Sequence, residues 1–207
     1  AGIGGVALWL WWGAAALGLV ALIYVWPGAM GFQKRDGRHS LAVSLLLAPY
    51  LLGAWLNSRW WTRRNPAPDA IFDDVWLGRM PGSQEMRGGG FAALCDFTAE
   101  LPAPRGDWHY AGLAWLDLVP PDAAQLVQAA HLIESARAHG RVLVCCALGY
   151  SRSAGAVLAW LLLTRRAANL DAAEALLRAR RVQVVLSPAL RAVLAELNPV
   201  DEEEGAA

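Results

Sequence analysis

The amino-terminal part of this chain constrains its fold most, because the first 33 residues contain no charged side chain. Within them, residues 3–26 form one apolar run, IGGVALWLWWGAAALGLVALIYVW. Crossing a hydrocarbon core of roughly 30 Å takes about 20 helical residues, so the run is long enough. The apolar region of a signal peptide is only about 7–15 residues long and follows a basic segment. Neither condition holds here, so we expect a transmembrane helix.

A second uncharged run covers residues 40–57, SLAVSLLLAPYLLGAWLN, and is interrupted by Pro49. We expect a second transmembrane helix there, and hence a membrane region over residues 1–61. Tryptophan favours membrane interfaces, and seven of the eleven tryptophans precede residue 62: Trp9, Trp11, Trp12, Trp26, Trp55, Trp60 and Trp61. This distribution supports a multi-pass membrane protein.

Charge and cysteine usage bear on orientation and compartment. Three basic residues lie between the two runs and three follow the second, namely Lys34, Arg35, Arg38, Arg59, Arg63 and Arg64. Equal numbers give no orientation under the positive-inside rule. An odd cysteine count with one adjacent pair is a poor disulfide framework, so we expect free thiols in a reducing compartment. The soluble part is therefore expected in the cytoplasm. The net charge is zero and the sequence has no basic stripe, so we expect no nucleic-acid partner.

The rest of the chain is organised as a linker, a domain and a tail. Residues 62–70, TRRNPAPDA, are typical of a linker, which reaches only about 30 Å when extended. Residues 199–207 form an acidic tail that we expect to be disordered. Between them, residues 71–198 alternate strand-like and helix-like segments, which predicts an α/β domain with a mostly parallel sheet flanked by helices. The expected strands are 75–78, 91–98, 109–118 and 141–146, and the expected helices are 120–140, 153–165, 171–180 and 187–197.

The chemistry is concentrated in residues 144–153, VCCALGYSRS, between a strand-like and a helix-like run. A loop that leads into a helix amino terminus turns N–H groups and the positive end of the helix dipole toward an anion. Arg152 adds a planar fork that matches phosphate oxygens. Such surroundings lower the pKa of a thiol, here that of Cys146. At Gly149 the absence of a Cβ lets the backbone approach the anion.

The segment CALGYSRS resembles the C-x5-R-S/T loop of cysteine-dependent phosphatases, and CxxGxSRS resembles their dual-specificity branch. The resemblance implies a phosphatase fold in which Cys146 is the nucleophile and forms a phosphocysteine. It implies that Arg152 binds phosphate and stabilises the transition state, and that Ser153 helps the thiolate to leave. The phosphate-binding residues would be Ala147, Leu148, Gly149, Tyr150, Ser151 and Arg152.

The resemblance extends over roughly residues 71–197. DVWLGRMPG is similar to the family's entry strand, and WLDLVPP resembles the segment that carries its general acid. This implies that Asp117, 29 residues before Cys146, is the acid, with Asp107 and Asp122 as rivals. One position departs from the family, because Cys145 stands where a histidine usually precedes the nucleophile.

Other reactive side chains have structural interpretations. We expect Cys145 and Cys95 to be small buried side chains. The histidines are scattered without ligand spacing, so we predict neither a metal nor a cofactor; they are His39, His109, His131 and His139.

The uncharged side chains of Ala147, Leu148 and Tyr150 argue against substrates with several phosphates, which need several cations. The pattern is also similar to the phosphatidylglycerophosphate phosphatase lineage and to bacterial inner-membrane phosphatases. We therefore expect a phosphatase of the bacterial inner membrane that acts on a phospholipid headgroup such as phosphatidylglycerophosphate. A protein tyrosine or dual-specificity phosphatase and an inactive phosphate-binding module remain alternatives. The sequence makes no prediction of an oligomeric state.

Overall fold

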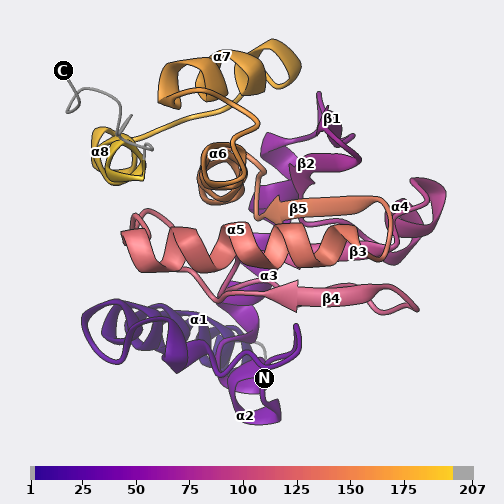
Figure 1. The fold of residues 1–207 in the computed structure, drawn as a ribbon. Coiled ribbons are helices and arrows are strands. Elements are labelled where there is room, and N and C mark those ends of the chain that lie inside the picture. Colours follow the sequence, from indigo (N-terminus) through magenta and orange to yellow (C-terminus); the bar gives the residue numbers. More distant parts are fainter. Residues whose placement is uncertain (1–2, 198–207) are drawn as a thin grey trace, which may run out of the picture.

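The structure, a computed structural model, describes residues 3–197, so the expected acidic tail lies outside the described residues. An amino-terminal helical region comes first, with α1 (Ile3–Val25), the 3-10 helix η1 (Gly28–Phe32), α2 (Leu41–Leu46) and α3 (Ala48–Trp61). The α/β domain follows, and Figure 1 shows its sheet and helices beside that region.

The helix α1 agrees with the first predicted transmembrane segment. Residues 7–25 are long and apolar enough to cross a membrane, and within residues 3–197 no other helix meets that criterion.

The predicted second span is not confirmed, because residues 40–57 form two shorter helices that meet at Leu47. Pro49 explains the break, since proline has no N–H to donate to the carbonyl of Leu45. The helix therefore restarts with proline in its first turn, where the N–H is not needed.

The sheet has five strands in the order β1-β2-β5-β3-β4. Its strands are β1 (Asp69–Phe72), β2 (Val75–Arg79), β3 (Ala93–Asp96), β4 (His109–Gly112) and β5 (Val142–Cys146). The edge strand β1 is antiparallel to β2, and the other pairs are parallel. The sheet is therefore mixed but mostly parallel, and the four predicted strands are confirmed, although β3 and β4 are shorter than expected. The strand β1 was not predicted, and it includes the last two residues of the proposed linker.

Helices cover both faces of the sheet. The helices α5 (Ala123–Arg137) and α6 (Arg152–Leu163) pack on one face over the main apolar core. The helix α4 (Ser83–Gly88) and the segment before β4 cover the other face. The strand β5 serves both layers, because its side chains alternate between the two cores.

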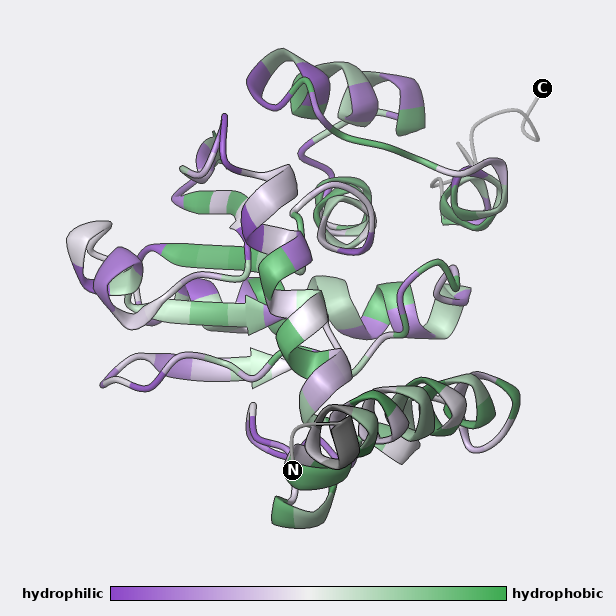
Figure 2. Cartoon of the chain, turned by 180° about the vertical axis from the view of Figure 1, so that it is seen from behind, coloured by the Kyte–Doolittle hydropathy of each residue, from purple (hydrophilic) through white to green (hydrophobic). Residues whose placement is uncertain are grey.

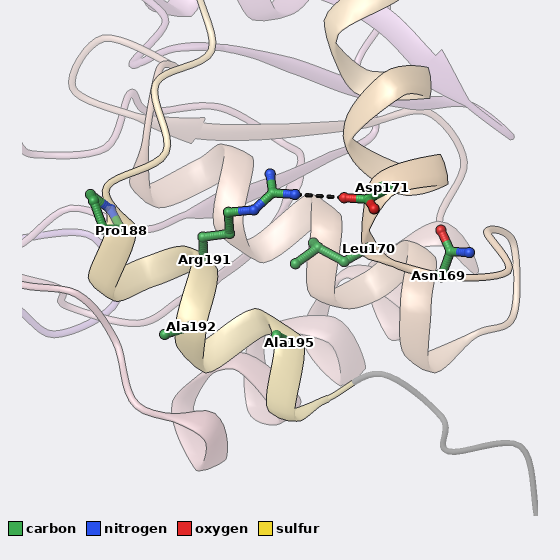
Figure 3. A pocket seen from close by; sticks show the side chains of 7 residues that line it. All are labelled: Asn169, Leu170, Asp171, Pro188, Arg191, Ala192 and Ala195. Carbon is green, nitrogen blue, oxygen red and sulfur yellow. Dashed lines mark hydrogen bonds and ion pairs between the residues drawn. The ribbon is translucent and has the colours of Figure 1, made fainter.

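Two further helices, α7 (Leu170–Arg180) and α8 (Pro188–Glu196), agree with prediction. A cavity of about 640 Å³ lies between them. Figure 3 shows Arg191 reaching across it to Asp171, at 2.5 Å, and Arg191 also pairs with Glu174. Ion pairs therefore bridge this cavity, and its lining shares no residue with the loop that carries Cys146.

The helix α3 crosses the carboxyl ends of the parallel strands, as Figure 2 shows from behind. Near its end, Ser58 contacts the segment after β5 and Arg59 contacts the segment after β2. The predicted membrane region is thus also a wall of the α/β domain.

Candidate active site

Residues 146–152, the thiol loop, connect the end of β5 to the start of α6. Gly149 has a φ of +73°, which favours glycine. A Cβ there would lie 2.4 Å from the carbonyl oxygen of Gly78 in β2. The loop therefore requires glycine at this position because of both its conformation and its close approach to β2. The anion-facing role of Gly149 stays a prediction.

Four consecutive carbonyl groups of the thiol loop accept hydrogen bonds from outside it. The Ser58 hydroxyl donates to Ala147 at 2.5 Å, and the amide of Val185 donates to Tyr150 at 2.9 Å. Arg181 donates to the carbonyls of both Gly149 and Leu148, at 2.9 and 3.4 Å. In a planar trans peptide the N–H points away from the C=O, so the amides of residues 148–151 are turned toward the opposite side.

The thiol of Cys146 lies on that inner side. The amide of Gly149 and the hydroxyl of Ser153 each donate a hydrogen bond to its Sγ, at 3.2 Å. Burial alone would raise the pKa of Cys146, but the charge of Arg152 and these donors outweigh it, so the pKa is lowered. The site therefore favours a thiolate.

The guanidinium of Arg152 is held by Glu100 and a backbone carbonyl. Its two Nη atoms donate to the Glu100 carboxylate at 2.8 and 2.6 Å, and Nη1 also donates to the carbonyl of Trp115 at 2.9 Å. Burial would lower the pKa of Arg152, but Glu100 more than compensates and raises it. Burial would likewise raise the pKa of Glu100, and Arg152 reverses this and lowers it. Both groups are therefore charged, and the arginine beside the thiol is oriented in advance.

Asp117 lies at the mouth of this site. Its Oδ1 is 3.1 Å from Nη2 of Arg152, and its side chain is 52% exposed. The next residue, Leu118, has a φ of +60° and is exposed. Of the three predicted acids, Asp117 alone lines the cavity next to the thiol loop. Asp122 instead caps α5, where it accepts from the amide of Gln125 at 2.7 Å, and Asp107 lies in an exposed bend.

The remaining thiols are buried in the core, as predicted. All three cysteines are free. Cys145 belongs to the core layer opposite the main one and lies 3.9 Å from the sulfur of Met80. Burial, followed by the charge of Asp96, raises the pKa of Cys145, and burial raises that of Cys95 to about 12. The residue at the usual histidine position is therefore a neutral core side chain.

A cavity of about 520 Å³ lies beside the thiol loop. Ala147, Leu148, Glu100 and Asp117 line one side of it. The helices α1 and α3 supply the other side, with Gly13, Leu17, Pro49, Tyr50, Gly53, Ala54 and Asn57. The approach to the thiol loop therefore has a largely apolar wall made by the predicted membrane region.

Several residues of this site were not predicted from the sequence. Glu100, Ser58 and Arg181 hold the thiol loop or its arginine, and Arg181 is itself anchored by Asp69 at 2.7 Å. Basic residues cluster at the end of α7, but nothing in that cluster indicates which one reaches the loop. Within residues 3–197, no group of three or more His, Cys, Asp or Glu side chains is placed to hold a metal ion.

The protein has a mixed β-sheet flanked by helices, and a buried thiol and a buried arginine lie where a strand leads through a loop into a helix. This combination defines a cysteine-based phosphatase. Residues 91–199 match the sequence model of the family described as dual specificity phosphatase, catalytic domain. Because the match covers more than half of the chain, the protein belongs to this dual-specificity phosphatase family. No curated protein matches the chain.

Solved structures share the fold. PTPMT1 in complex with PI(5)P is 20% identical with a TM-score of 0.54, and the match covers 61% of this chain and 91% of PTPMT1. Human DUSP28 is 21% identical with a TM-score of 0.56, over 62% of this chain and 94% of DUSP28. Tk-PTP in its active form is 27% identical with a TM-score of 0.57, over 64% of this chain and 97% of Tk-PTP. Each match therefore covers nearly the whole length of the solved phosphatase.

Proposed function

We propose that the protein is a membrane-anchored phosphomonoesterase that acts on a phospholipid headgroup such as phosphatidylglycerophosphate. The observation that carries this proposal is the cavity beside the thiol loop, whose far wall is apolar and comes from α1 and α3. A substrate with a lipid tail can present its phosphate to Cys146 while its apolar part contacts that wall. A soluble phosphopeptide gains nothing from such a wall.

The proposed reaction has two steps. The Cys146 thiolate attacks phosphorus and forms the S–P bond as the P–O bond to the headgroup breaks, and Asp117 protonates the departing oxygen. Water then attacks phosphorus, Asp117 accepts its proton, and the S–P bond breaks to release phosphate and thiolate. Ser153 stabilises the leaving sulfur through the hydrogen bond that it already makes. Arg152 and the amides of the thiol loop hold the phosphoryl oxygens.

The contact between Asp117 and Arg152 fits this sequence of events. A phosphate that binds to Nη2 displaces the Asp117 carboxylate, which can then take up a proton and donate it to the departing oxygen. The half-exposed position of Asp117 allows this shift.

The class of lipid follows from charge. No basic side chain occurs among residues 147–151, so the loop is suited to one phosphomonoester. PTPMT1 was solved with PI(5)P, a lipid whose name specifies a single phosphomonoester. That complex supports a lipid ligand for this fold. It does not identify the headgroup on which the present protein acts. We further propose that residues 71–198 form the catalytic domain, on the cytoplasmic side of a bacterial inner membrane.

Hydrolysis by the purified full-length chain in mixed micelles tests this function. We expect phosphatidylglycerophosphate to be cleaved with a higher kcat/KM than phosphotyrosine peptides, and Cys146→Ser to lose both activities. The reverse preference would favour a protein phosphatase. Binding of tungstate without turnover of any phosphoester would favour the inactive module.

A further inference from the structure

We propose that α2 and α3 lie along the surface of an anionic bilayer and do not cross it. The connector before them (residues 33–40) then lies on the same side of the membrane as the catalytic domain. A two-span topology requires the opposite arrangement, with the connector and the domain on different sides. Both ends of the α2–α3 segment are attached to the catalytic domain.

The connector is fixed to the catalytic domain by buried polar contacts. Nζ of Lys34 lies 2.6 Å from Oδ2 of Asp96 at the end of β3, and donates to the hydroxyl and the carbonyl of Thr98 at 2.8 Å. The side chains of Lys34 and Asp96 are 3% and 0% exposed. The carbonyl of Gly37 accepts from the amide of Ala103 at 2.8 Å. Because removing one partner of a buried ion pair is strongly unfavourable, this attachment is not a loose contact.

The other end of the segment is fixed to the same domain. Ser58 is buried and donates to the carbonyl of Ala147, and Nη1 of Arg59 donates to the carbonyl of Met80 at 2.9 Å. A transmembrane helix places its ends on opposite sides of a bilayer, whereas both ends here contact one domain. In addition, the 14 residues of α3 extend only about 21 Å, which is less than the hydrocarbon core of roughly 30 Å.

The outward face of the segment is apolar, as the green colouring of α2 in Figure 2 illustrates. Its exposed large side chains are Leu41, Leu45, Leu46, Leu52, Trp55, Leu56, Trp60 and Trp61. Exposed leucine and tryptophan side chains next to basic residues are typical of a segment that lies at a membrane interface. The face is continuous with α1, whose own apolar side chains are exposed.

The charges around this face favour an anionic bilayer over a second copy of the chain. Residues 34–64 contain six basic residues and one acidic residue, Asp36. Arg35, Arg38, Arg63 and Arg64 are exposed, and Arg63 stacks over the ring of Trp60 at 3.8 Å. Two copies meeting through this face would bring like charges together, whereas anionic headgroups neutralise them.

Sidedness can be tested without any assay of activity. Arg35→Cys in the connector and Gln84→Cys in the catalytic domain both place a thiol at an exposed position. Both variants, and the Leu56→Cys variant below, are made in a Cys146→Ser background, which removes the reactive native thiol, while Cys95 and Cys145 are buried. Each variant is treated with a membrane-impermeant maleimide in intact cells and in inverted vesicles, and detergent-solubilised protein defines full labelling. We expect both positions to react from the same side. Labelling from opposite sides would overturn the proposal and restore the two-span topology.

Depth is tested with a fluorophore on Leu56→Cys in vesicles that contain phosphatidylglycerol. We expect stronger quenching by nitroxides near the headgroup than by nitroxides deep in the acyl chains. Stronger quenching by the deep nitroxides would contradict an interfacial position. A fluorophore insensitive to both nitroxides, together with cross-linking between copies, would show that a second chain covers the face. These outcomes do not depend on the substrate, so the proposed function can fail while this inference holds.

Discussion

At the scale of single residues, the reactivity of Cys146 depends on two donors and one cation. Because its pKa is lowered, iodoacetate should inactivate the protein with a midpoint below the ordinary thiol value of about 8.5. Ser153→Ala removes one donor to the charged sulfur, so the midpoint should move up by roughly one to two pH units. Inactivation rates measured against pH check this prediction. An unchanged midpoint in Ser153→Ala would show that the hydroxyl does not stabilise the thiolate.

The buried pair between Glu100 and Arg152 should matter for both stability and activity. Glu100→Gln removes the buried carboxylate from Arg152 and leaves it only the half-exposed Asp117, which should cost about 3–5 kcal/mol in the free energy of unfolding. Glu85→Gln is the matched control, because Glu85 pairs with Arg79 at the surface, where such a pair contributes about 0–1 kcal/mol. Denaturant titration of both variants measures the difference.

The contribution of Glu100 to the free energy of unfolding should decrease in acid. The lowered pKa of Glu100 means that its stabilising contribution is complete above the pKa of an unfolded glutamate, about 4.3. The contribution is lost as the pH falls through the lower, folded pKa. The difference between wild type and Glu100→Gln should therefore be constant near neutral pH and shrink only in strong acid. If this difference shrinks between pH 8 and pH 6, a group other than Glu100 is responsible for the pH dependence.

Asp117 should act on the leaving group. Asp117→Asn should slow the hydrolysis of alkyl phosphates by about 10²- to 10⁴-fold, as expected for loss of a general acid. Hydrolysis of p-nitrophenyl phosphate should be slowed far less, because p-nitrophenolate leaves without a proton. Comparison of kcat for the two substrates checks this. Equal slowing would remove Asp117 from the role of acid.

At the scale of secondary-structure elements, a hydrogen bond joins α3 of the apolar amino-terminal region to the thiol loop. Ser58→Ala leaves the carbonyl of Ala147 without its donor, which should cost about 1–3 kcal/mol in stability. The loss of loop position should lower kcat roughly tenfold, equivalent to about 1.4 kcal/mol in the barrier.

Ser58→Thr retains the hydroxyl and should restore kcat, which separates loop positioning from a general loss of packing. If Ser58→Ala and Ser58→Thr lose activity equally, the hydrogen bond is not the cause.

Most helices and strands of the catalytic domain were predictable from periodicity and from Pro and Gly at helix ends, but β1 and α4 were not. The thiol loop was predictable because its residues are adjacent in the sequence. Glu100, Ser58 and Arg181 were not, because they lie 52, 89 and 32 residues from their partners in the loop. No local pattern carries such long-range contacts.

At the scale of the whole molecule, composition correctly indicated an apolar amino-terminal region but not how it is attached. The prediction of a second span rested on hydropathy alone, which does not register that Lys34 and Ser58 contact the same domain. Helices α1 and α3 of this apolar region line part of the cavity beside the thiol loop.

In the proposed mechanism, Cys146 forms a covalent bond to the phosphoryl group. Ser153→Ala should slow hydrolysis of the intermediate, so incubation with ³²P-labelled substrate followed by rapid denaturation should trap phosphate on the protein. We expect the label on the peptide that contains Cys146, in near-stoichiometric amount, and none in Cys146→Ser. Turnover without a trapped label, or a label on another residue, would contradict a phosphocysteine intermediate at Cys146.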